Sequence, residues 1–180
     1  GKEINQGITS QIGSKIRSII HFDSTYVFGG PNGLYVLKND QLSYLENTEK
    51  LNINNLCYEN GKVFIASRSG LFFVTEANDF NDPTLIELVE ESVNSVECDL
   101  NQNLWIGTNN GLYVMLKDGN IVPIILDQED FKSKTVIGLL CTKSGDIWTS
   151  TMNGVYQISV LKNKSYKYKV SHYGSAEGLI

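Results

Sequence analysis

Hydrophobic and polar residues follow a nine-residue pattern that returns four times along the chain. In each copy a large apolar residue lies six positions before a glycine, and a small residue lies four positions before it. The copies are Val27–Tyr35, Phe64–Phe72, Trp105–Tyr113 and Trp148–Tyr156. Their glycines, Gly33, Gly70, Gly111 and Gly154, are spaced 37, 41 and 43 residues apart. A period of about 40 residues is typical of repeat proteins, so the pattern predicts four copies of one structural unit.

Each unit divides into four short apolar segments separated by turn residues. In the third copy the predicted strands cover approximately residues 94–98, 104–107, 112–116 and 121–126. The sequence Asn109-Asn110-Gly111 is a hairpin signal of the Asn-Gly kind, in which a positive φ is needed. The fourth copy has the same arrangement, with turns at Ser144-Gly145-Asp146 and Asn153-Gly154. No segment of useful length has helical periodicity, so we expect an all-β chain.

Four antiparallel strands in each period of about 40 residues are typical of a β-propeller blade. An immunoglobulin-like sandwich also has many short strands, but it would not repeat one nonapeptide four times. We therefore predict an all-β fold of four propeller-type blades, a fragment of a larger propeller. The chain is expected to form a single partial propeller domain over residues 1–180, with repeats at about 15–50, 51–91, 92–134 and 135–175.

The repeat resembles that of the two-component regulator propeller family. The segment Asp99–Tyr113 matches the pattern of that family nearly throughout, and Thr142–Tyr156 matches it with Thr149-Ser150 in place of Ile-Gly. The first two copies depart further, because Val27 and Phe64 stand where the family has Trp. The residues at 172–179 resemble the family's link into a following blade.

The resemblance implies a periplasmic sensor segment of a membrane-anchored hybrid two-component histidine kinase of the Bacteroidetes type. Such a segment binds a small molecule or a glycan-derived oligosaccharide and signals by conformational change, without catalysis of its own. The kinase domain and the membrane contact would belong to parts of the full-length protein that this chain does not include.

Charge argues against a nucleic-acid partner. The net charge is −5, and the sequence pI is about 5.0, whereas nucleic-acid surfaces need clustered cations. The basic stretch Lys162–Lys169 is better explained by strand alternation, with Tyr166, Tyr168 and Val170 on one face and the lysines on the other.

Catalysis would need an acid/base pair or a cation held by carboxylates and histidine. His21 and His172 lie at different places in their repeats, and the acidic pairs Glu90-Glu91 and Glu129-Asp130 are typical of solvated loops. We expect no catalytic residue, no metal ligand and no cofactor. A propeller lyase or glycoside hydrolase is the alternative from the enzyme class, and a protein-interaction scaffold is a third hypothesis.

The three cysteines lie seven residues before the large apolar residue of their repeats, where the first repeat has Ile20. They are Cys57, Cys98 and Cys141. This spacing predicts three equivalent, reduced core residues, because a free cysteine often behaves as a small hydrophobe.

The loops between second and third strands carry the candidate ligand-binding residues. These are Asn32, Arg68, Asn109, Asn110 and Asn153. Loops that vary on a constant frame are suited to recognition, and amide and guanidinium groups can bind sugar hydroxyls or carboxylates. The alternative is that Asn is present for turn geometry alone.

Four blades in an open arc leave the inner faces of the first and last blades uncovered, so the chain either closes into a tight four-bladed ring or associates with other chains, and the blade shape of the family is set for a wider ring. We therefore expect self-association as a homodimer. Its interface should be mainly apolar and should involve residues near Ile16–Ile20 and Val136–Tyr156.

Overall fold

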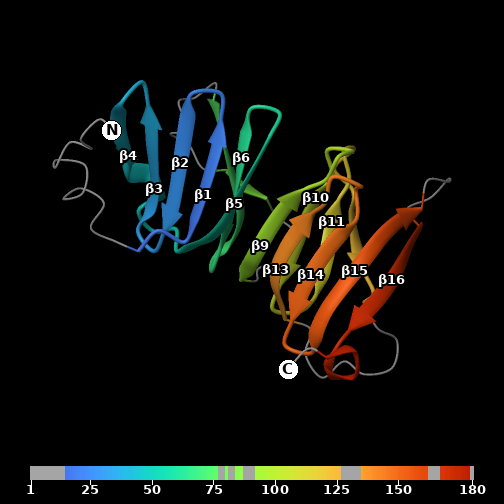
Figure 1. Ribbon diagram of the computed structural model, residues 1–180. Helices are drawn as coiled ribbons and strands as arrows, with labels where there is room; N and C mark the ends of the chain where they lie inside the picture. The colour runs from blue at the N-terminus through green and yellow to red at the C-terminus, as the bar shows by residue number, and fades with distance from the viewer. Residues whose placement is uncertain are drawn as a thin grey trace, which may run out of the picture. The chain divides into compact units, whose positions relative to one another are not determined.

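A computed structural model describes residues 15–76, 80, 84–86, 92–126, 135–161 and 167–178 (Figure 1). The chain divides into two compact units, Gly1–Ile86 and Glu87–Ile180. Each unit contains two four-stranded antiparallel sheets, in which strands adjacent in sequence are hydrogen-bonded neighbours. The prediction of an all-β chain built from four repeats of four antiparallel strands is confirmed.

Unit 1 contains the first two sheets, which we call blades 1 and 2. Blade 1 consists of β1 (Ser18–Phe22), β2 (Thr25–Gly30), β3 (Gly33–Lys38) and β4 (Gln41–Leu45). The 3-10 helix η1 (Glu46–Thr48) follows it. Blade 2 consists of β5 (Ile53–Glu59), β6 (Lys62–Ser67), β7 (Gly70–Thr75) and β8 (Thr84–Ile86).

Unit 2 contains blades 3 and 4. Blade 3 consists of β9 (Val93–Cys98), β10 (Leu104–Thr108), β11 (Leu112–Met115) and β12 (Ile121–Ile124). Blade 4 consists of β13 (Val136–Cys141), β14 (Ile147–Thr151), β15 (Gly154–Leu161) and β16 (Lys167–Tyr173), and the 3-10 helix η3 (Ser175–Glu177) follows. One blade lies within each of the four repeat ranges deduced from the sequence. Within the described residues, no helix is long and apolar enough to cross a membrane.

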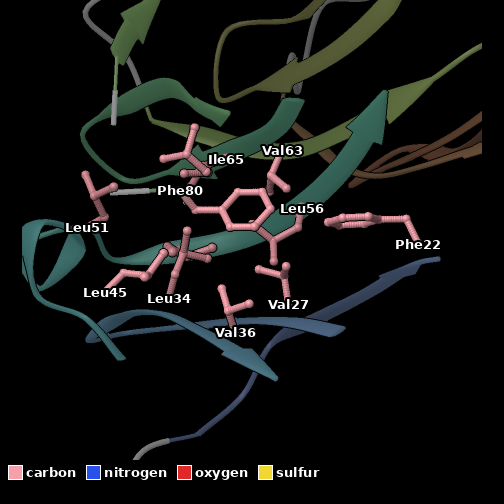
Figure 2. Packing of buried hydrophobic residues seen from close by; sticks show 12 residues of the cluster. Phe22, Val27, Leu34, Val36, Leu45, Leu51, Leu56, Val63, Ile65 and Phe80 are labelled. Carbon is pink, nitrogen blue, oxygen red and sulfur yellow. The ribbon is translucent and has the colours of Figure 1, made fainter. Parts of the chain in front are cut away.

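The core of unit 1 lies between its two sheets (Figure 2). Successive side chains of a strand point to opposite faces, so alternate residues of blade 1 turn toward blade 2. Val27, Leu34 and Val36 contribute from blade 1, and Leu56 and Ile65 contribute from blade 2. Phe22 stacks on Tyr58 with the ring centroids 3.7 Å apart, which closes one end of this core.

The core of unit 2 is built in the same way around Trp105. This side chain is fully buried and clusters with Leu112 and Ile124 of blade 3 and with Val136 and Ile147 of blade 4. The pattern had predicted burial of the large residue six positions before each repeat glycine. The prediction is confirmed for three copies, namely Val27, Phe64 and Trp105. It is wrong for Trp148, which is only partly buried.

The predicted equivalence of the cysteines is also wrong. In the strand register, Cys57 lies opposite Phe64 on the neighbouring strand, whereas Cys98 lies opposite Leu104 and Cys141 lies opposite Ile147. The turn between the first two strands is longer in blades 3 and 4, so Cys98 and Cys141 lie on the opposite sheet face. Cys57 and Cys98 are disulfide-bonded, and Cys141 is a free thiol, so the expectation of three reduced cysteines fails for two of them.

Candidate functional site

The candidate residues lie on four hairpins of common design at one end of the blades. In blades 1, 2 and 4 a two-residue loop joins the second and third strands. The residue before this loop lies opposite the repeat glycine in the strand register, as Ser67 does with Gly70. In blade 3 the amide of Thr108 donates to the carbonyl of Gly111 at 2.9 Å. Each repeat glycine has a positive φ, between 97° and 145°. Asn109 and Asn110 do not, so the predicted positive φ falls on the glycine alone.

In three of these turns a Ser or Thr hydroxyl group makes hydrogen bonds that stabilise the loop. The sequence reasoning missed these hydroxyl groups. Thr108 Oγ1 accepts a hydrogen bond from the amide of Asn110 at 3.0 Å and donates to the carbonyl of Gly111 at 3.0 Å. Ser67 and Thr151 make the same pair of bonds in blades 2 and 4. The available signal was the Ser or Thr three positions before the glycine. In blade 1 this position is Gly30, and Thr48 instead accepts a bond from the Leu34 amide at 2.8 Å.

The five predicted binding residues are all exposed. Unit 1 contains Asn32, whose carbonyl accepts a bond from the Tyr44 hydroxyl at 2.8 Å, and Arg68, whose amide donates to the carbonyl of Asn52 at 3.1 Å. Both bonds involve backbone atoms of Asn32 and Arg68, and the side chains of these two residues take no part in them. Ligand binding by either residue stays a prediction.

Unit 2 contains the other three predicted residues. Asn109 Oδ1 accepts a bond from Asn94 Nδ2 at 2.9 Å. The carbonyl of Asn153 lies 3.0 Å from His172 Nε2, and the amide of Asn110 is held by Thr108 as described above. Asn109 and Asn110 are adjacent on one hairpin of blade 3, and Asn153 lies on the corresponding hairpin of blade 4. Their proposed part in ligand binding is likewise untested.

Two polar side chains at the starts of first strands bridge neighbouring blades at this same end. In unit 2, Asn94 Nδ2 donates to the carbonyl of Val136 at 2.9 Å. In unit 1, Arg17 Nη1 donates to the carbonyl of Ile53 at 3.1 Å, which is the corresponding bond in the repeat. Sequence reasoning did not find this bridge, because the longer turn between the first two strands of blades 3 and 4 shifts Asn94 and Val136 by one position relative to the repeat glycine.

Arg17 and Arg68 bring two guanidinium groups to this end of unit 1. Arg17 donates to the side-chain oxygen of Asn52 and to that of Asn54 at 3.3 Å. The backbone of Arg68 bonds the carbonyl of the same Asn52. Both arginine side chains are exposed. Guanidinium groups bind carboxylates strongly because they offer charge-assisted, often bidentate hydrogen bonds.

Two pockets are lined by other residues of the blades. A pocket of about 410 Å³ in unit 1 is lined by residues of β3 and β4 with Phe80. A pocket of about 270 Å³ in unit 2 is lined by Trp148, Val155, Tyr173 and Glu177. The rings of Trp148 and Tyr173 stack with their centroids 5.4 Å apart. Neither pocket is lined by a predicted binding residue.

The buried carboxylate of Asp99 stabilises a turn by accepting hydrogen bonds. Its Oδ1 accepts bonds from the amides of Asn101 and Asn103, and its Oδ2 accepts bonds from Asn103 Nδ2 and from Trp105 Nε1 at 3.1 Å. These bonds tie the turn between β9 and β10 to the core tryptophan.

The titratable residues considered for catalysis are placed as follows. His21 packs on Tyr26 and His172 stacks on Tyr156, with centroid separations of 4.3 and 4.5 Å. The acidic pairs Glu90-Glu91 and Glu129-Asp130 lie outside the described residues. Among the residues that the structure describes, no group of three or more His, Cys, Asp or Glu could hold a metal ion.

Burial perturbs two titratable groups in unit 2. Desolvation raises the pKa of Glu97, and a hydrogen bond from the Cys141 amide at 3.0 Å opposes part of this rise. Desolvation also raises the pKa of the Cys141 thiol, with a smaller contribution from the carboxylate of Glu97. Glu97 spans the interface from blade 3 to blade 4, so its environment follows from blade packing.

No family model matches the sequence, and neither does any curated protein. Solved structures of similar fold include the extracellular domain of a proposed hybrid two-component system from Bacteroides thetaiotaomicron. It is 22% identical with a TM-score of 0.68, and the match covers 90% of this chain and 22% of that one. A second such domain from the same organism is 19% identical with a TM-score of 0.60, and the match covers 92% of this chain and 29% of that one.

An enzyme with this fold also matches. Virginiamycin B lyase from Staphylococcus aureus is 12% identical with a TM-score of 0.67, and the match covers 89% of this chain and 56% of the lyase. The chain thus spans about a quarter of the length of each of these extracellular domains and about half of the length of the lyase. At these identities the likeness shows the fold alone, which is that of β-propeller blades.

Proposed function

We propose that the chain is the ligand-binding part of an extracytoplasmic sensor and that its hairpin end binds an acidic, glycan-derived oligosaccharide. The observation that carries the proposal is the hairpin design: the backbone is held alike in three blades, while the exposed loop residues differ between blades. A rigid frame with variable loops suits recognition of a specific ligand.

The ligand class follows from the groups exposed at that end of unit 1. Arg68 and Arg17 supply cationic donors, and Asn32 supplies a neutral amide. Hydrogen bonds between charged partners contribute more than neutral ones, so a carboxylate-bearing sugar has an advantage over a neutral one. The surrounding amides match sugar hydroxyls, because they can both donate and accept.

The extracytoplasmic location rests on two observations. Cys57 and Cys98 are disulfide-bonded, and disulfides persist mainly in oxidising compartments such as the periplasm. Solved structures of similar fold include extracellular domains of signalling systems. A bound ligand signals only if it binds one conformation of the sensor better than another, so the proposal requires a difference in affinity between two states.

Titration calorimetry with two defined probes tests the proposal: trigalacturonic acid as an acidic trisaccharide and maltotriose as a neutral one. We expect the acidic probe to bind about tenfold more tightly, since one charge-assisted hydrogen bond contributes about 1.5–3 kcal/mol. Arg68→Ala should weaken its binding by about tenfold for the same reason. Lys38→Ala is the matched control, because it removes one exposed cation at the opposite end of β3.

Equal binding of trigalacturonic acid by wild-type chain and Arg68→Ala would refute the assigned site. Absence of binding by either probe would refute the ligand class. Chromatography of the probes after incubation addresses the lyase and hydrolase alternative, because shortened or unsaturated products would overturn a purely sensory role.

A further inference from the structure

A backbone atom fixes the orientation of the Asn94 side chain in unit 2. Asn94 Nδ2 donates a hydrogen bond to the carbonyl oxygen of Val136 at 2.9 Å. A carbonyl oxygen can only accept, so the amino group of Asn94, and not its amide oxygen, must face Val136. Val136 is fully buried, and a Cβ atom at Gly107 would overlap its side chain. Blade 4 therefore packs directly on blade 3 at this point, and the accepting carbonyl is held in a close-packed position.

The orientation of Asn94 in turn sets the orientation of Asn109. The same Nδ2 of Asn94 also donates to Asn109 Oδ1, at 2.9 Å. An amino group offers donors only, so the atom of Asn109 that faces it must be the amide oxygen. Nδ2 of Asn109 lies on the other branch of the amide and points away from Asn94. Because Asn109 is exposed, the group that its side chain presents outward is a hydrogen-bond donor.

The backbone of Asn109 is held at the same place. Its carbonyl accepts a hydrogen bond from Thr135 Oγ1 at 3.2 Å, so the start of blade 4 contacts this hairpin by main chain and side chain together. The bonds described above for Asn32, Arg68 and Asn153 use backbone atoms of these residues only. Asn109 differs from these three residues because its side chain is oriented before a ligand binds.

We propose that Asn94 is a positioning residue of the ligand site, which fixes Asn109 as a hydrogen-bond donor toward a carboxylate oxygen of the bound oligosaccharide. The inference rests on the proposed function and adds to it the polarity of one contact. A carboxylate only accepts hydrogen bonds, so it matches an outward Nδ2 and would be repelled by an outward amide oxygen. A side chain that is already oriented also loses less conformational freedom on binding, which increases affinity.

The fixed amide favours a carboxylate over a sugar hydroxyl as the group bound at Asn109. A hydroxyl both donates and accepts, so it can bind either branch of a freely rotating amide and gains less from the orientation. A hydrogen bond to a charged acceptor is also stronger than one to a neutral acceptor. The bridge between the blades thus contributes to selectivity for acidic ligands, although Asn94 itself need not touch the ligand.

Titration calorimetry with trigalacturonic acid on wild-type chain, Asn109→Ala, Asn94→Ala and the double variant tests the proposal. Asn109→Ala should bind at least about tenfold more weakly, because it loses a hydrogen bond to a charged acceptor. Asn94→Ala should bind about twofold to tenfold more weakly, because Asn109 is no longer oriented. The double variant should bind as Asn109→Ala does, because no amide is left to orient.

Asn101→Ala is the matched control. It removes an exposed asparagine side chain from the turn between β9 and β10, at the other end of blade 3, and its affinity should equal that of the wild-type chain. Circular dichroism checks that each variant folds. Exchange of side-chain amide hydrogens with water, followed by NMR in the ligand-free wild-type chain, is a second measurement that needs no Asn94 variant. The amino group of Asn94 should exchange more slowly than that of Asn109.

A weakening by Asn94→Ala that persists undiminished in the Asn109→Ala background would overturn the proposal, because Asn94 would then act only by holding the blades together. Unchanged binding by Asn109→Ala, or an Asn109 amino group that exchanges as slowly as that of Asn94, would overturn it too. Both of these results leave the proposed function standing. Failure of the wild-type chain to bind trigalacturonic acid would instead overturn the proposed function together with this inference.

Discussion

Removal of Trp105 tests how the core of unit 2 is built. The side chain has no exposed surface, and its Nε1 donates a hydrogen bond to Asp99 Oδ2 at 3.1 Å. Truncating a buried aromatic residue to alanine costs about 3–5 kcal/mol, and loss of the hydrogen bond places this case in the upper half of that range. A unit of this size has a free energy of unfolding of roughly 5–14 kcal/mol, so Trp105→Ala should remove a large share of it.

Two further variants separate the contributions to this loss. Trp105→Phe keeps most of the apolar volume but loses the donor, and it should cost about 1–3 kcal/mol. Trp148→Ala changes the corresponding but partly buried residue of blade 4, and it should cost only about 1–2 kcal/mol. The difference between the two alanine variants measures the burial that blade 4 supplies to Trp105.

Urea unfolding followed by circular dichroism, at low protein concentration, measures these free energies. The chain has two tryptophans, both in unit 2, so tryptophan fluorescence of wild-type chain and Trp105→Phe reports on that unit. A loss of less than about 1 kcal/mol for Trp105→Ala, or a loss no larger than that of Trp148→Ala, would contradict this account of the core, because removing a fully buried and hydrogen-bonded side chain costs more than that.

Three further predictions concern unit 2. Thr149 is buried, and its Oγ1 has no hydrogen-bond partner among the described residues, so Thr149→Val should raise the melting temperature through a gain of about 1–2 kcal/mol. Burial raises the pKa of Glu97 above its ordinary value of 4.5, so its stabilising contribution is greatest below pH 4.5 and is lost as pH rises through the raised value. Glu97→Gln should therefore melt at a higher temperature than wild type at neutral pH, and an advantage that does not shrink in acid would contradict the assignment. Without reductant, intact-mass analysis should show alkylation of Cys141 alone, and slowly because its thiol pKa is raised, whereas labelling of Cys57 or Cys98 before reduction would contradict the disulfide assignment.

The sequence by itself determined the local structure of this protein. Apolar alternation specified the strands, and the repeat glycine specified the hairpin between second and third strands, because both depend on a few adjacent residues. The period near 40 residues then specified four blades, since one supersecondary unit repeats when its pattern repeats. Each of these inferences needed only neighbours along the chain.

Only the tertiary structure decided which equivalent positions differ in environment. Trp105 and Trp148 have the same place in the repeat, yet only Trp105 is buried, because burial depends on the sheet packed against it. The longer turns of blades 3 and 4 moved Cys98 and Cys141 to the other sheet face from Cys57, which constant spacing in the sequence concealed. The bridge from Asn94 to blade 4 was hidden for a related reason: a hydrogen bond to a backbone carbonyl leaves no trace in the identity of the accepting residue.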